Sequence, residues 1–203
     1  MKLTWLGHSC FHICTAEGSI VFDPYSDHYV PGYGTIRVTA DGVFCSHDHL
    51  DHNHIESVTL SGHPLTAPVE ILNTFHDEEQ GALRGRNRIH ILRAEGMRVA
   101  HLGDLGHMPD EQTLHALHRV DALLIPVGGY YTIDATTAKT LADLCDARVV
   151  IPMHYRFGAH GYDVISELSD FTDRCNNVVY YPGNTLELTA DTPSQTAILT
   201  YEP

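Results

Sequence analysis

The chain has 203 residues, 43% of them hydrophobic, and a formal charge of −14 with its histidines neutral. A compact domain of this length buries about 70% of the surface of its unfolded chain, so it needs no disulfides to hold a core. The negative charge argues against a surface for nucleic acid or anionic membranes, because neutralising phosphates takes clustered Lys and Arg.

Two features of the chain predict a cytoplasmic location. Lys2 is followed directly by Leu3-Thr4-Trp5-Leu6-Gly7, which lacks the apolar stretch of a secretory signal, and runs such as Ala122–Ile125 are too short to cross a membrane. The five cysteines are odd in number and form no CxxC pair. We therefore expect free thiols in a reducing compartment.

Short β-like runs fill the first half of the chain. Apolar or β-branched residues predict strands over residues 2–6, 10–15, 19–23, 42–45, 64–67, 88–93 and 97–102. Glu95-Gly96 predicts the hairpin that joins the last two. Residues 25–34 hold two glycines, a proline and three tyrosines, and predict a loop.

The second half alternates strands with helices. Asp134 precedes a predicted helix whose residues 138, 141, 142 and 145 form one apolar face. Asp163 precedes a second predicted helix, with apolar residues at 164, 168 and 171. Strands are expected over residues 122–125, 148–151 and 178–180. No linker or internal repeat interrupts the pattern, so we predict one α/β domain over residues 1–203.

Four histidines and two aspartates crowd into the nine residues SHDHLDHNH, from Ser46 to His54. Side chains two apart on an extended chain point the same way, so His47 and His49 can converge on one metal ion. Asp51 and His52 follow after a bend and point to a neighbouring position. Imidazole and carboxylate together suit Zn, Fe, Mn or Ni better than Ca or Mg. A solvated histidine-rich loop is the alternative, but the H-x-H-x-D-H spacing directly after a predicted strand favours two adjacent metal sites.

This spacing resembles the signature of the metallo-β-lactamase superfamily. The resemblance implies a four-layer αβ/βα sandwich, with two facing mixed sheets, helices outside, and metals at one edge of the sheets. Members supply a further His, a bridging Asp and a last His from loops after strands. His76 matches the first of these better than His63 or His90. The implied ligands are His47, His49 and His76 for the first metal, Asp51, His52 and His154 for the second, and Asp104 as the bridge.

Within the superfamily, Trp5–Ser9 and residues 81–87, 103–107 and 126–132 resemble compact metal-dependent hydrolases related to L-ascorbate-6-phosphate lactonase. The resemblance implies two divalent transition-metal ions, Zn first, with Mn, Fe or Ni as alternatives. Such a pair lowers the pKa of a shared water, and the hydroxide attacks a lactone, ester, amide or phosphoester. Asp104 and Asp51 are the catalytic carboxylates in this scheme.

Residues outside the ligand set suggest how a substrate is held. Arg84 and Arg86 could grip a phosphate or carboxylate, since Arg forms bidentate bonds with such groups. Asn87 lies beside them, and Tyr130 and Tyr131 follow a Gly-Gly turn and could line the pocket. A solvated turn is the alternative for the arginines, and simple packing for the tyrosines.

His8 is a third catalytic candidate. It follows an apolar run and the break at Gly7, so it should project from the end of a strand towards the metal edge, and the related hydrolases carry a matching Gly-His. We expect a hydrogen-bond donor to substrate or a general acid, outside the metal ligands. A histidine that merely caps the turn is the alternative.

The predicted function is therefore a dinuclear hydrolase of a small-molecule substrate, which could carry an anionic group. Neither nucleic acid nor membrane is expected as a partner, and a homo-oligomer is left open. A nuclease or phosphodiesterase of the same fold is the first alternative, although the −14 charge opposes it. A non-catalytic metal-binding module is the second, although a degenerate member should have lost a ligand.

Overall fold

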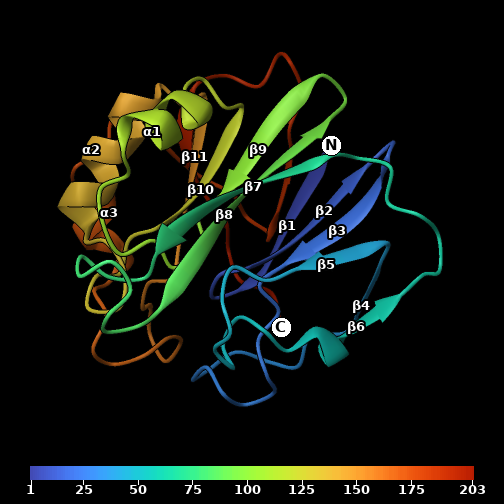
Figure 1. Cartoon of the computed structure of the whole chain (residues 1–203), viewed down its shortest axis with the longest axis horizontal. Helices are drawn as coiled ribbons and strands as arrows, with labels where there is room; N and C mark the ends of the chain where they lie inside the picture. Colours follow the sequence, from blue (N-terminus) through green and yellow to red (C-terminus); the bar gives the residue numbers. More distant parts are fainter.

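Two β-sheets face each other in the computed structural model, which describes residues 1–203 (Figure 1). The five-stranded sheet has the order β13 (Thr185–Glu187), β1 (Lys2–Gly7), β2 (Cys10–Thr15), β3 (Gly18–Phe22) and β5 (Gly42–Phe44). The seven-stranded sheet has the order β12 (Val178–Tyr180), β14 (Gln195–Ile198), β11 (Val149–Met153), β10 (Ala122–Pro126), β9 (Met97–His101), β8 (Arg86–Ala94) and β7 (Val69–Phe75). β4 (Val38–Ala40) and β6 (Val58–Leu60) form a separate parallel pair, and a 3₁₀ turn over Ile55–Ser57 directly precedes β6.

Both sheets mix parallel and antiparallel pairs, as predicted. β1, β2 and β3 are antiparallel neighbours, whereas β3 and β5 run parallel. In the larger sheet, β7, β8 and β9 are antiparallel and β9 to β12 are joined by parallel pairs. The expected pair of facing mixed sheets is therefore confirmed.

Apolar side chains between the two sheets, and between the larger sheet and the helices, form one cluster of 48 buried residues. Along β1, Leu3 and Trp5 are buried and alternate with more exposed residues, as a strand with one covered face requires. β10 is buried at all five positions, because it has parallel neighbours on both sides and α2 packs on it.

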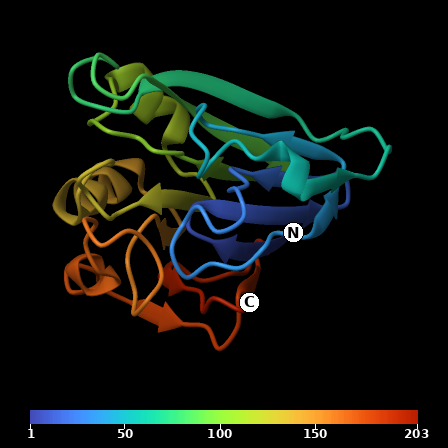
Figure 2. The same ribbon diagram turned by 90° about the horizontal axis from the view of Figure 1, so that it is seen from below.

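The three α-helices lie on one side of the molecule. These are α1 (Glu111–Leu117), α2 (Ala135–Cys145) and α3 (Leu168–Thr172). All three lie beside the seven-stranded sheet and away from β1 to β5 (Figures 1 and 2), so the expected outer helices cover only one of the two sheets. Asp134 caps α2 as predicted, accepting a hydrogen bond from the Thr137 N–H at 2.8 Å. None of these helices has the length and apolar character needed to cross a membrane.

Two predicted elements were wrong in position. Residues 64–67 form no strand, because Pro64 and Pro68 remove two backbone donors, and β7 begins only at Val69. The helix expected from Val164 begins at Leu168. Residues 163–165 form a turn, in which the Ile165 N–H donates to the Tyr162 carbonyl, and the next two residues pair elsewhere: the Ser166 N–H donates to the Gly128 carbonyl and Glu167 bridges to Arg156.

Candidate metal centre

The loop after β5 carries the histidine cluster to the rim where the sheets meet. The His49 carbonyl accepts hydrogen bonds from the N–H groups of His52 and Asn53, both at 2.9 Å. The chain therefore turns directly after His49, as expected. His47 and His49 lie before the turn, and Asp51 and His52 lie in it.

The structure gathers the predicted ligands into two groups. In the first, the donor atoms of His47, His49 and His76 lie within 4.8 Å of one another. His76 follows β7, whereas His63 is exposed and His90 packs on Phe22 in the core. The second group has the same spread and consists of Asp51, His52, His154 and, in addition, His8.

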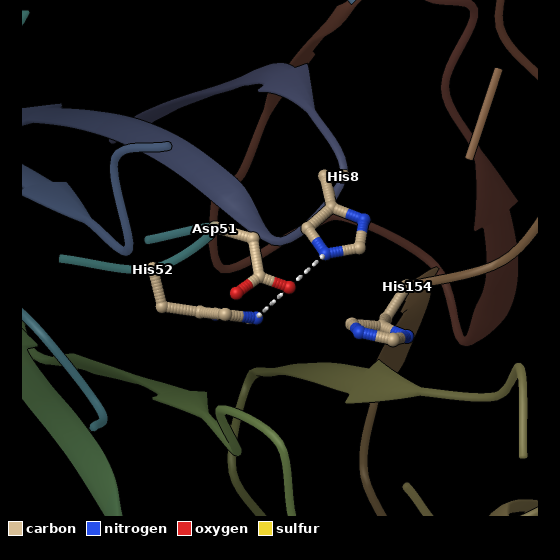
Figure 3. Close-up of side chains that lie close together, drawn as sticks. All are labelled: His8, Asp51, His52 and His154. Atoms are coloured by element: carbon tan, nitrogen blue, oxygen red, sulfur yellow. Dashed lines mark ion pairs between the residues drawn. The ribbon is translucent and has the colours of Figure 1, made fainter. Parts of the chain in front are cut away.

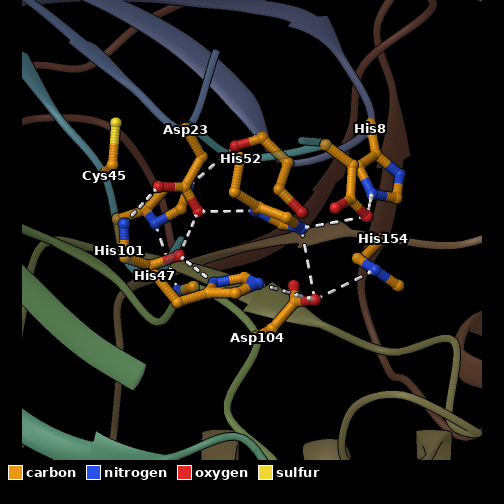
Figure 4. Close-up of polar contacts among 12 residues, drawn as sticks. His8, Asp23, Cys45, His47, His52, His101, Asp104 and His154 are labelled. Atoms are coloured by element: carbon orange, nitrogen blue, oxygen red, sulfur yellow. Dashed lines mark hydrogen bonds and ion pairs between the residues drawn. The ribbon is translucent and has the colours of Figure 1, made fainter. Parts of the chain in front are cut away.

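Asp104 lies between the two groups, where the chain leaves β9. Its Oδ2 approaches one Nε2 from each of four histidines, two in each group, of which His47, His52 and His154 are labelled in Figure 4. The distances are 3.2 Å to His52, 3.2 Å to His76, 3.3 Å to His154 and 3.9 Å to His47. A single carboxylate oxygen is thus placed where a ligand shared by two metal ions has to be.

The hydrogen bonding of the buried rings shows that these residues fit a metal centre. Nε2 of His47, His52, His76 and His154 is buried without a hydrogen-bond partner, and so is Oδ1 of Asp104. An unpaired buried polar atom normally costs about 1–3 kcal/mol. Several such atoms converging on two points are explained by metal ions that bind them, because neutral imidazole and carboxylate are the donors that Zn and similar ions take.

Asp23 holds one ligand of each group in place, and the sequence interpretation did not include it. Its Oδ2 accepts from Nδ1 of His52 at 2.8 Å and from the Ser46 hydroxyl at 2.6 Å. Because that hydroxyl gives its proton to Asp23, it accepts from Nδ1 of His47, 2.8 Å away. Both imidazoles therefore carry hydrogen on Nδ1 and present Nε2 to the centre, the arrangement in which a carboxylate orients a metal-binding histidine.

Protonation in the metal-free protein follows from burial and from neighbouring charge. Burial, with a further contribution from His52, lowers the pKa of His47 to about 3, so this ring is neutral at pH 7. Burial would raise the pKa of Asp104, but His154 and His52 hold it well below its usual range. Burial would also lower the pKa of His52, but Asp104 and Asp51 raise it, so metal binding has to displace a proton from this ring.

Two glycines let neighbouring loops approach the ligand backbones closely. A Cβ at Gly106 would lie 2.3 Å from the carbonyl carbon of His76, and a Cβ at Gly128 would lie 2.2 Å from the His154 carbonyl oxygen. Any side chain at either position would push a ligand loop away. His154 itself has a left-handed backbone, with φ of 54°.

A pocket of about 420 Å³ opens on the first group, a size suited to a small molecule. Its lining residues are Tyr29, Asp48, His49, Leu50, Asp51, His76, Arg84, Asp104, Tyr131 and Tyr162. Arg84 is its only Lys or Arg. Another hollow, of about 320 Å³ beside α2, contains no histidine.

The structure changes the predicted substrate contacts. Asn87 is fully buried, with its amide group hydrogen-bonded to Thr74 and Leu102 and its Oδ1 accepting from the Asp104 N–H, so the prediction of substrate binding was wrong. Arg86 is exposed at the start of β8 and lies outside the pocket lining, so this prediction was also wrong. Tyr131 lines the pocket as predicted.

Arg84 reaches the pocket through a loop built around Asp77. The Asp77 carboxylate accepts four backbone hydrogen bonds, from residues 79, 81, 83 and 84, at 2.7–3.2 Å. The Arg84 guanidinium then lies over the rings of Tyr131 and Tyr130, 5.6 and 6.0 Å from their centroids. Tyr130 is 63% exposed and lines only the adjoining hollow, so it is a support for Arg84 and not part of the metal pocket.

Tyr162 is a pocket residue that sequence reasoning missed. Its hydroxyl donates to Oδ2 of Asp51 at 3.3 Å, and it lines the pocket beside Tyr131. Burial, together with the charge of Asp51, raises the pKa of Tyr162, so the hydroxyl remains a donor at neutral pH. The only sign of this role in the sequence is the residue type, since tyrosine can donate a hydrogen bond and line a pocket.

Comparison with known proteins agrees with the geometry. A family model, the beta-lactamase superfamily domain, matches residues 2–154. A UPF0173 metal-dependent hydrolase of Methanospirillum hungatei is 27% identical over 93% of this chain and 99% of its own. A UPF0173 protein of Pyrococcus abyssi is 30% identical over 79% of this chain and 85% of its own.

The similarity extends to solved structures. The crystal structure of a Thermotoga maritima protein, described as a Zn-dependent hydrolase of the metallo-beta-lactamase superfamily, has a TM-score of 0.76 and 32% identity. The match covers 98% of this chain and 97% of that one. The chain therefore belongs to the metallo-β-lactamase superfamily, among its UPF0173 metal-dependent hydrolases.

Proposed function

We propose that the protein is a dinuclear metal-dependent hydrolase that cleaves a small lactone, ester or phosphoester carrying an anionic group. The observation that supports two metals is the position of Asp104, whose Oδ2 lies within 3.3 Å of Nε2 atoms from both histidine groups. When bound, two such ions supply a water of lowered pKa and positive charge near the oxygen that becomes negative.

The residues of the chain orient the reaction around that charge. Asp104 holds the two groups at a fixed separation, and Asp51 forms the boundary between the second group and the pocket. Tyr162 donates its hydroxyl proton to Asp51 and so holds this carboxylate in position at the pocket wall. His49 and His76 form the floor on which the reacting bond would lie.

The unpartnered guanidinium of Arg84 supports an anionic substrate. This guanidinium has no carboxylate partner and no hydrogen bond, although the side chain is half-buried and held over two rings. A phosphate or carboxylate in the pocket would supply the missing bidentate partner. The motif resemblance to hydrolases related to L-ascorbate-6-phosphate lactonase agrees with such a substrate, and we propose that the protein acts on it in the cytoplasm.

The test is hydrolysis of matched pairs of substrates by the Zn- or Mn-loaded protein. Lactones, simple esters and phosphodiesters would each be assayed with and without a phosphate or carboxylate group. We expect the protein to hydrolyse one class of substrate, and we expect a chelator to abolish this activity. Arg84→Gln should raise KM for its anionic member by about 10–100-fold, the worth of a charge-assisted bond, and leave the neutral member unchanged.

Arg86→Gln is the matched control, because Arg86 lies two residues away but outside the pocket. Absence of hydrolysis across the panel by protein that carries two metals would contradict the proposed activity. An equal effect of Arg84→Gln on charged and neutral substrates would contradict anion recognition alone.

A further inference from the structure

His8 does not occupy the place expected of a general acid. It follows β1, is fully buried and is absent from the pocket lining, so it cannot contact a substrate there. That prediction was wrong. The turn-capping alternative also fails for the ring, since neither Nδ1 nor Nε2 of His8 has a hydrogen-bond partner.

The ring instead points into the second ligand group. Figure 3 shows His8, Asp51, His52 and His154 converging from three segments of the chain, since Asp51 and His52 are neighbours in the sequence. Nε2 of His8 and Nε2 of His52 each lie 3.5 Å from Oδ2 of Asp51. Ligands about 2.0–2.1 Å from a tetrahedral ion are about 3.3–3.4 Å apart, so this spacing matches atoms that share an ion.

The backbone supports this placement. His8 has a left-handed conformation, with φ of 51°, and its carbonyl accepts a 2.9 Å bond from Nε1 of Trp5 and a 3.4 Å bond from the His154 N–H. Its ring centroid lies 4.2 Å from that of His154. The structure thus holds His8 in a left-handed conformation that is costly for a non-glycine residue, and this conformation places its ring beside Asp51, His52 and His154.

The two groups differ in exposure through His49, since His47 and His76 of the first group are buried too. In the second, His8 and His52 are fully buried and His154 is 1% exposed, with only Asp51 reaching the pocket. In the first, His49 is exposed, and both His49 and His76 line the pocket.

We propose that His8 is a metal ligand, so that the second site is buried and has four donors of its own, whereas the first is open and has three of its own. The buried site binds its metal ion first and holds it more tightly, whereas the open site exchanges its ion with solvent and faces the substrate. Asp104 is shared by both. Because it concerns the same metals, this assignment rests on the proposed function.

The test is stepwise zinc binding to the metal-free protein, followed by competition with a chromophoric chelator and metal analysis. The wild type should show one tight and one weak equivalent. His8→Gln should weaken the tight step by more than about 100-fold, beyond the 10–100-fold typical of residues that only orient a ligand. It should leave the weak step in place.

His8→Gln separates the two roles that the distances allow for His8, which are a metal ligand and a hydrogen-bond donor to Asp51. The Gln amide can still donate to Asp51 from near the Nε2 position, but it is a poor zinc ligand. His49→Gln should affect only the weak step. His90→Leu, which alters a buried histidine outside both groups, should change neither step.

Wild-type protein provides a readout that does not depend on a variant folding. With one equivalent of Co²⁺, the paramagnetically shifted imidazole N–H signals should come from His8, His52 and His154 and not from His49. Unchanged tight binding in His8→Gln, or shifted signals from His49 in place of His8, would overturn the assignment while leaving the dinuclear hydrolase intact. A wild type that binds no zinc would overturn both.

Discussion

Asp23 and His52 are 29 residues apart, yet Oδ2 of Asp23 lies 2.8 Å from Nδ1 of His52 inside the protein. The same oxygen accepts from Ser46, so one carboxylate orients a ligand in each group. Burial would raise the pKa of Asp23, but His101 and the bond from His52 hold it well below its usual range. It is therefore a full negative charge that fixes the two rings.

Asp23→Asn should weaken binding of both metals by about 10–100-fold, the usual cost of losing an orienting carboxylate. The amide keeps the shape but removes the charge and one acceptor. Chelator competition measures this loss. Asp41→Asn is the control, because Asp41 also accepts bonds from two serines, at Ser19 and Ser61, but lies outside the centre. Equal losses in the two variants would show that the effect is general destabilisation.

Asp104→Asn should reduce the metal content below two per chain and lower turnover by at least about 100-fold, because it removes the shared charged ligand. Metal analysis and a single-substrate assay measure the two effects. Normal turnover with full metal content would show that another residue bridges the ions.

Asn87→Ala should lower stability by about 3 kcal/mol, because it leaves the buried Asp104 N–H and Leu102 carbonyl without partners. KM should stay the same in the folded fraction, since Asn87 is not in the pocket. Denaturant unfolding and steady-state kinetics separate the two. A raised KM with unchanged stability would restore the substrate-binding role that the sequence suggested.

Asp77→Asn should reproduce the effect of Arg84→Gln on the anionic substrate, because the amide turns one acceptor into a donor facing backbone N–H groups. Glu78→Gln is the control. Burial would raise the pKa of Asp77, but four N–H donors lower it. The ionised Asp77 carboxylate therefore stabilises the Arg84 loop fully at pH values above the ordinary carboxyl pKa. This stabilisation is lost as the pH falls through the lowered pKa of Asp77. KM against pH measures this, and a flat profile at low pH would contradict it.

His90 should make the metal-free protein sensitive to acid. Burial lowers its pKa from 6.5 to about 4, so the unfolded chain binds a proton that the folded chain does not as pH falls from about 6.5 to 4. Stability falls with pH across that window, by about 3 kcal/mol from this residue. His90→Leu should flatten this limb of the stability curve, measured by urea unfolding at pH 7 and pH 4. Parallel curves for variant and wild type would refute it.

The spacing of residues in the sequence was enough to predict much of the candidate metal centre. His47, His49, Asp51 and His52 lie in one loop, so the chain alone brings them together, and His154 follows a strand whose carboxyl end reaches the same rim. Asp23 was missed because its partners Ser46 and His52 lie 23 and 29 residues away. His8 was misassigned because its partners lie 43 or more residues away. Which ring nitrogen faces which carboxylate depends on the packing of the two sheets.

Dependence on distant contacts also explains why the sequence could not tell Arg84, which lines the pocket, from Arg86, which does not. Arg84 and Arg86 are equivalent in the sequence, two residues apart in a basic run. Four backbone bonds to Asp77 close a loop that ends at Arg84, whereas Arg86 already belongs to β8 and faces solvent. The residue pattern predicted β1, β2, β3, β5, β8 to β12 and α2, but not β4, β6, β7, β13, β14 or α1. The late start of α3 depends on a pairing of Glu167 with Arg156 that no local pattern shows.

The centre spans the line where the two sheets meet, with His8 and Asp51 contributed by the first sheet's loops and Asp104 and His154 by the second's. During synthesis, donors therefore leave the ribosome over a long interval, from His8 to His154. A nascent chain that already displays His47, His49 and His52 can bind stray metal ions before the correct partners exist. Tight metal binding is thus expected only after β11 has docked, and nascent chains arrested before His154 should hold zinc loosely and lose it to mild chelators.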